Sequence, residues 1–101
     1  MDKYIENLKN DNTINRVQDE NGNLYGIRVL GRGNNLFFQE NDKALICEID
    51  AVHAVIFTKT IKKWEGEKEM SVEEKKRVTN LIQKYYKEVY NPDVKLLAIN
   101  L

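Results

Sequence analysis

The sequence predicts an α+β fold in which one long helix covers an antiparallel sheet. Turn-forming residues recur about every 8–12 positions over the N-terminal half, which is typical of a β-meander. A single strongly amphipathic segment follows at 71–89, and a last apolar run follows Pro92. Together these observations predict about five meander strands, a helix packed on the sheet and a closing C-terminal strand, all in a single domain spanning residues 1–101.

The helix has a clear start and a clear end. Ser71 followed by Glu74 forms a capping box, which satisfies free amide donors at a helix N-terminus. Asn91 and Pro92 block continuation after the last apolar position. Apolar residues recur at helical spacing along one face: Val78, Leu81, Ile82, Tyr85, Tyr86 and Val89. This stripe needs a partner layer, and the sheet is the expected one.

The strands are predicted from apolar runs separated by turn residues. The predicted strands cover 13–17, 24–30, 35–39, 44–49, 52–61 and 94–99. Asn21-Gly22 between the first two is a strong hairpin signal, because both residues tolerate the positive φ of tight turns. Before the first strand, residues 2–9 are expected to form one or two helical turns with Tyr4, Ile5 and Leu8 on one side.

Composition indicates a globular protein rather than a disordered or membrane-spanning one. Hydrophobic residues make up 42% of the chain and charged residues 32%. No apolar run approaches the roughly 18 residues needed to span a bilayer. The single cysteine cannot form an internal disulfide, which favours a reducing compartment. We therefore expect a cytoplasmic protein.

The formal net charge is zero, but the charge is unevenly distributed. Residues 1–56 hold six Lys or Arg and nine Asp or Glu, a net of 6 − 9 = −3. Residues 57–101 hold ten and seven, a net of 10 − 7 = +3. Because the whole chain has no general attraction for nucleic acids or membranes, a charged partner must be recognised by a local patch.

No catalytic, cofactor-binding or metal-binding motif is evident. Gly31-Arg32-Gly33 lacks the helix start that a phosphate cradle requires and reads as a turn. Cys47 lies between apolar neighbours and is expected to be a buried hydrophobe. If Ile49 and Val52 close a two-residue hairpin, the thiol of Cys47 and the imidazole of His53 lie on opposite faces of the sheet. We therefore predict a protein that is not an enzyme and needs no cofactor.

Two further features favour structural roles. Lys75-Lys76-Arg77 is interleaved with glutamates, so we interpret it as a solvated helix face and not as a nucleic-acid site. Trp64, between the last meander strand and the helix, is expected to cover the edge of the core with its indole N–H on a polar partner. The alternative is an exposed anchor for a protein partner.

Two short motifs and the helix that follows them carry a family resemblance. The motifs are Thr60–Glu65 (TIKKWE) and, after a polar link, Ser71–Lys75 (SVEEK). They resemble a small family of bacterial immunity proteins, which protect the cell that makes a polymorphic or contact-dependent growth-inhibition toxin. The resemblance covers about the C-terminal half of the chain, and Gly66 stands where family members often have a proline.

The resemblance implies a non-enzymatic inhibitor that binds the C-terminal domain of its cognate toxin in the cytoplasm and blocks the active site or substrate access. Such toxins are frequently nucleases with basic surfaces, so the inhibitor is expected to present acidic residues on its surface. Alternate turns of a meander lie at the same end of the sheet, so the turn at Asp19-Glu20 and the turn at 40–42 should lie together. Phe37 and Phe38 are adjacent in a strand, so one of them should face outward unless both faces of the sheet are covered. The candidate toxin-contacting residues are Asp19, Glu20, Phe37, Phe38, Glu40 and Asp42.

Alternatives from other classes stay open. A non-enzymatic subunit of another complex has no sequence feature that separates it from an immunity protein. A small nucleic-acid-binding module would bind RNA or DNA with a steep dependence on salt, which zero net charge does not favour. No membrane partner and no direct nucleic-acid partner are expected, and the protein is expected to be a monomer or a weak dimer formed through an exposed edge strand.

Overall fold

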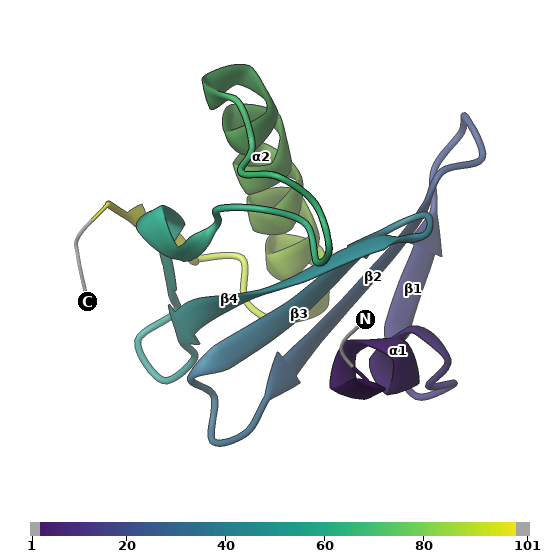
Figure 1. Cartoon of the computed structure of the whole chain (residues 1–101). Coiled ribbons are helices and arrows are strands. Elements are labelled where there is room, and N and C mark those ends of the chain that lie inside the picture. The colour runs from purple at the N-terminus through teal and green to yellow at the C-terminus, as the bar shows by residue number, and fades with distance from the viewer. Residues whose placement is uncertain (1–2, 99–101) are drawn as a thin grey trace.

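A computed structural model describes residues 3–98 as a six-stranded sheet with a helix on each face (Figure 1). The elements in chain order are α1 (Lys3–Lys9), β1 (Asn15–Gln18), β2 (Leu24–Leu30), β3 (Asn35–Glu40), β4 (Lys43–Asp50), β5 (Val55–Phe57), the 3-10 turn η1 (Thr58–Thr60), α2 (Val72–Val89) and β6 (Lys95–Leu97). The predicted α+β class, with a largely antiparallel sheet, a long helix and a last strand, is therefore confirmed. None of the helices in this described range is long and apolar enough to cross a membrane.

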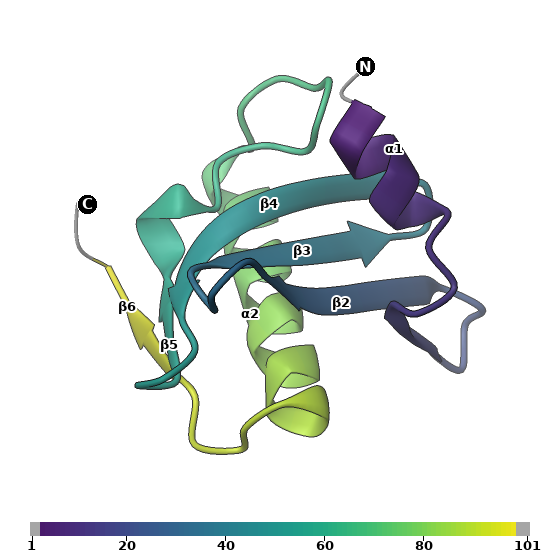
Figure 2. The same ribbon diagram turned by 90° about the horizontal axis from the view of Figure 1, so that it is seen from below.

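The strands lie in the order in which they occur in the chain, from β1 to β6. Neighbours from β1 to β5 are antiparallel, as expected of a meander. The last strand differs, because β6 pairs parallel with β5. Parallel neighbours need a crossover connection, and α2 supplies it between them (Figure 2).

Most of the core lies between the sheet and α2. Leu36 and Phe38 of β3 belong to this cluster together with Val78 and Ile82 of the helix, all fully buried. The other sheet face is covered in part by α1, whose Ile5 and Leu8 join a second, smaller cluster. A two-layer arrangement was expected, so the covering of the second face by this short helix is a correction to the prediction.

The start of α2 shows one half of the predicted capping box, the hydrogen bond to the Ser71 side chain. The Ser71 side chain accepts a hydrogen bond from the amide of Glu74 at 3.1 Å. The Glu74 side chain turns away from the cap and accepts from the indole N–H of Trp64 at 3.2 Å. Trp64 is 2% exposed, so its predicted role at the edge of the core is confirmed.

The strand predicted over 52–61 is much shorter in the structure. Residues 51–54 form a turn in which Ala54 adopts φ 54°, and β5 begins only at Val55. The Asp50 side chain stabilises this turn by accepting from the amide of His53 at 3.1 Å. The predicted pairing of Ile49 with Val52 is therefore wrong, since Ile49 pairs with Ile56.

Candidate functional site

The two acidic turns meet at one end of the sheet, which we name the acidic end and define by Asp19, Glu20, Glu40 and Asp42. Asn41 joins the turns, because its side-chain amide donates to the Asn23 side chain at 3.1 Å. The side-chain oxygen of Asn41 accepts a hydrogen bond from the backbone N–H of Leu24 at 3.0 Å, and the backbone N–H of Asn41 donates to the Leu24 carbonyl at 2.7 Å. Asn41 has φ 54°, a conformation that asparagine tolerates better than most residues. The predicted proximity of the two turns is therefore confirmed.

Asp19 is used to build its own turn. One carboxylate oxygen accepts from the amides of Asn21 and Asn23 at 2.9 and 2.8 Å, and the other accepts from the Asn23 side chain at 3.2 Å. Partial burial opposes ionisation, but the hydrogen bonds from Asn23 and Asn21 outweigh it and lower the pKa of Asp19. The carboxylate therefore shapes the loop that carries Glu20.

Glu40 is engaged by the helix. Its two carboxylate oxygens accept from the two terminal nitrogens of Arg77 at 2.7 and 2.8 Å. Arg77 also holds Glu74 through two hydrogen bonds of 2.8 and 2.9 Å, so one guanidinium joins β3 to the start of α2. Tyr25 and Trp64 complete the network by donating to Glu40 and Glu74, respectively. The Glu40 side chain is only 12% exposed, which limits its availability to a partner.

Within this network the charged forms of Glu74 and Arg77 are strongly favoured. Hydrogen bonds from Arg77, and secondarily from Trp64, lower the pKa of Glu74 to about 2. The same contacts, first with Glu40 and then with Glu74, raise the pKa of Arg77. Glu74 and Arg77 therefore stay charged across the physiological range, and Arg77 works as a fixed electrostatic brace between the two carboxylates that it contacts.

Glu20 and Asp42 remain available at the acidic end. Both are exposed, and neither side chain makes a hydrogen bond or ion pair with any residue in the described range. The charged residues in the two turns and those linked to them number six acids and three bases: Asp19, Glu20, Glu40, Asp42, Glu67 and Glu74 against Lys43, Arg77 and Lys84. Their sum of 3 − 6 = −3 makes this end locally negative in a neutral chain.

The two phenylalanines do not belong to the surface. Phe37 and Phe38 are both 0% exposed. Phe38 packs under α2, and Phe37 points to the opposite face, where it packs in the cluster that contains Ile5 and Leu8 of α1. The expectation that one of them contacts a partner fails because α1 covers the face on which the second ring would have been exposed.

Cys47 and His53 do not form a reactive pair. Cys47 is buried in the α2-side cluster, and burial raises the pKa of its thiol to about 12. The His53 side chain is 74% exposed in the turn after β4 and contacts the Asp50 carboxylate at 2.7 Å. Within residues 3–98, no three His, Cys, Asp or Glu side chains gather as potential metal ligands.

One surface went unrecognised in the sequence. The basic cluster Lys75-Lys76-Arg77 is divided in the structure, because Arg77 turns to the acidic end while Lys75 and Lys76 line a groove beside β6. The available signal was a second, weaker stripe along the helix, in which Val72 and Thr79 flank the two lysines at helical spacing.

Hydrogen bonds and ion pairs at the acidic end organise the two turns, and the thiol and imidazole lie in separate environments. An exposed and locally negative surface of this kind attracts a basic partner. Comparison of the chain with protein-family models, with curated proteins and with solved structures finds no match.

Proposed function

We propose that this chain is an immunity protein: a non-enzymatic inhibitor that binds a cognate cytotoxic domain in the cytoplasm and blocks its active site or substrate access. The resemblance of Thr60–Glu65 and Ser71–Lys75 to that family motivates the proposal. The observation that carries it is the acidic end, where two joined turns present unpaired carboxylates. A nuclease toxin, with its basic surface, is the partner that this charge suits best.

The construction of the acidic end favours tight binding. Asn41 and Asp19 fix the two turns before any partner arrives. A surface that is already ordered loses less conformational entropy on association, so more of the contact energy contributes to affinity. The net negative charge would also steer a basic domain and accelerate encounter, particularly at low salt.

The roles of the candidate residues divide within this proposal. Glu20 and Asp42 would contact the toxin directly, because they are exposed and unpaired. Asp19 and Glu40 would hold the turns in place and contribute to the field at longer range. The buried rings of Phe37 and Phe38 support the sheet under this surface.

Co-expression tests the proposal. Where the gene immediately upstream encodes a large secreted protein, the C-terminal domain of that protein is expressed with and without this chain. Death of cells that express the domain alone, with survival when this chain is present, is the expected result. Survival must be lost with Ile82→Asp, which removes the folded protein. Equal killing with and without the folded chain would overturn the proposal and leave the subunit of another complex as the better interpretation.

A further inference from the structure

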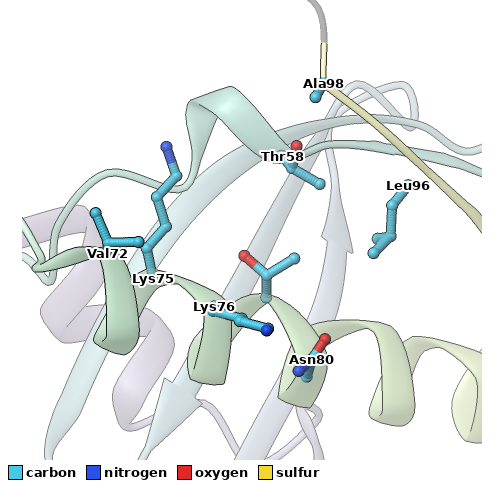
Figure 3. A pocket seen from close by; sticks show the side chains of 8 residues that line it. Thr58, Val72, Lys75, Lys76, Asn80, Leu96 and Ala98 are labelled. Atoms are coloured by element: carbon cyan, nitrogen blue, oxygen red, sulfur yellow. The ribbon is translucent and has the colours of Figure 1, made fainter.

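A groove separates the first half of α2 from β6 (Figure 3). It has a volume of about 400 Å³, enough to admit one or two side chains. The lining residues come from α2, from η1 and from the C-terminal strand region: Thr58, Val72, Lys75, Lys76, Thr79, Asn80, Leu96 and Ala98. The groove lies away from the acidic end and shares none of the residues that define it.

Apolar surface is left uncovered here. Val72 is 83% exposed, and Leu96 is 36% exposed although it is paired with the fully buried Ile56. Paired residues of neighbouring strands point to the same sheet face, so Leu96 faces α2 without being covered by it. In Figure 3 its side chain extends toward the helix across the open groove.

The outer edge of β6 is free to accept another strand. β6 is the last strand of the sheet, and no described residue pairs with its outer side. The amide of Lys95 donates to the Ala54 carbonyl at 2.8 Å. In a parallel ladder, alternate residues turn toward the partner strand, so the amide and carbonyl of Leu96 point away from β5. An exposed edge of this kind is a template for strand addition.

The charge beside the groove selects the partner. Lys75 and Lys76 contribute to the lining, and no carboxylate does. Neither lysine forms an ion pair within the described residues. A segment carrying acidic side chains would therefore gain two charge partners, whereas a basic segment would be repelled.

We propose that the β6 groove binds an extended segment of a partner protein, which adds a strand to β6, places an apolar side chain beside Leu96 and sets a carboxylate against Lys75 and Lys76. The partner chemistry is that of an extended segment that carries both an apolar and an acidic residue at alternate positions, i and i+2, because only alternate side chains of a strand face the groove. This inference does not depend on the function proposed for the acidic end.

A synthetic peptide tests the proposal with the intact chain. The probe is an eight-residue peptide, blocked at both ends, in which Leu and Glu take turns at every second position and Thr fills the positions between them. Binding is followed by the amide NMR signals of the protein. We expect shifts centred on Leu96, Ala98 and Thr79, with a dissociation constant below about 1 mM. Absence of binding at that concentration, or equal binding of the peptide with Lys in place of Glu, would overturn the proposal.

Two variants locate the contacts. The double variant Lys75→Glu, Lys76→Glu should weaken the acidic peptide at least about tenfold, whereas Lys84→Glu, Lys87→Glu on the exposed side of the same helix should have little effect. Leu96→Pro removes the outward amide together with the leucine side chain, at an edge position where proline is tolerated, and should also weaken binding. Unchanged affinity in both groove variants would contradict the proposal. So would matching shifts at Leu96 caused by self-association or by a single-stranded oligonucleotide.

Discussion

The acidic end and the β6 groove are two exposed surfaces of this domain that are built in opposite ways. At the acidic end the polar side chains are mostly engaged: Asp19 closes its turn, Asn41 joins two turns and Arg77 clamps Glu40. At the groove Lys75 and Lys76 are unpaired, and apolar surface of Leu96 stays open. The first surface is fixed before binding, whereas the second is completed by whatever binds.

The sheet supports this difference. Six residue pairs join β2 to β3, and six join β3 to β4, beneath the acidic end. Only two pairs join β4 to β5, and three join β5 to β6. Short ladders open locally at lower free energy, so the β6 region should exchange its amide hydrogens before the meander does. Rigid charge display and an adaptable edge are therefore separated within one small domain.

The largest expected effect distinguishes the buried stripe of α2 from its groove side. Ile82→Asp buries an unpaired charge in a fully buried position and should cost about 4 kcal/mol or more, a large share of a typical total of about 5–15. Leu96→Asp, at the partly exposed wall of the groove, should cost about 1 kcal/mol or less. Urea unfolding of both variants measures the difference. Equal costs would show that β6 is packed as tightly as the core.

Removing the brace of the acidic end should have the next largest effect. Arg77→Ala leaves Glu40 and Glu74 without their cation, and because both are only partly exposed we expect a loss of about 2–3 kcal/mol in the free energy of unfolding. Lys76→Ala is the matched control on the groove side and should change stability by less than about 0.5 kcal/mol. Chemical denaturation measures the free energy of unfolding of the two variants. Similar values would show that the contacts of Arg77 contribute little to stability.

Asn41, which joins the two turns, should contribute somewhat less to the free energy of unfolding than Arg77 does. Asn41→Ala removes two side-chain hydrogen bonds and places alanine, which tolerates positive φ less well than asparagine, at φ 54°. We therefore expect the free energy of unfolding to fall by about 1–2 kcal/mol. Asn41→Gly relieves the backbone conformation while still losing the hydrogen bonds. A glycine variant as stable as the native protein would assign the effect to the backbone alone. Thermal unfolding monitors both.

The smallest effect concerns pH. The Glu74 pKa is about 2 in the folded protein against 4.5 for an unperturbed glutamate, so its stabilising contribution is complete above about pH 5 and is lost as the pH falls toward 2. Because the side chain is 31% exposed, solvent screening reduces this contribution to about 1 kcal/mol. Glu74→Gln should flatten the stability profile between pH 5 and 2. Parallel profiles for the two proteins would contradict the assignment.

Features set by local chemistry could be predicted from the sequence, and those set by tertiary contacts could not. The cap at Ser71 and the buried stripe follow from residue spacing along the chain, and a polar partner for the indole of Trp64 follows from the chemistry of a buried tryptophan. Capture of Glu40 by Arg77 joins residues 37 positions apart and leaves no local pattern. The burial of Phe37 depends on α1, a seven-residue helix too short to be stable without the sheet that it covers.

The acidic end was therefore located correctly at the level of turns, but not at the level of side chains. The meander places both turns together, as alternation of strand direction requires. Which carboxylates stay free depends on partners supplied by the helix and by neighbouring amides. Only Glu20 and Asp42 of the six predicted contact residues are both exposed and unpaired among the described residues.

The most direct test of the central claim is the affinity of a toxin domain identified by the co-expression experiment for two charge-reversed variants at low salt. Glu20→Lys, Asp42→Lys changes the acidic end. The control Glu88→Lys, Asp93→Lys changes the net charge by the same amount at exposed positions near the end of α2 and just beyond it. We predict that the first pair weakens binding at least about tenfold, mainly through slower association, and that the control changes it less than about threefold. Equal affinities of the two variants would contradict the assignment of the acidic end as the binding surface.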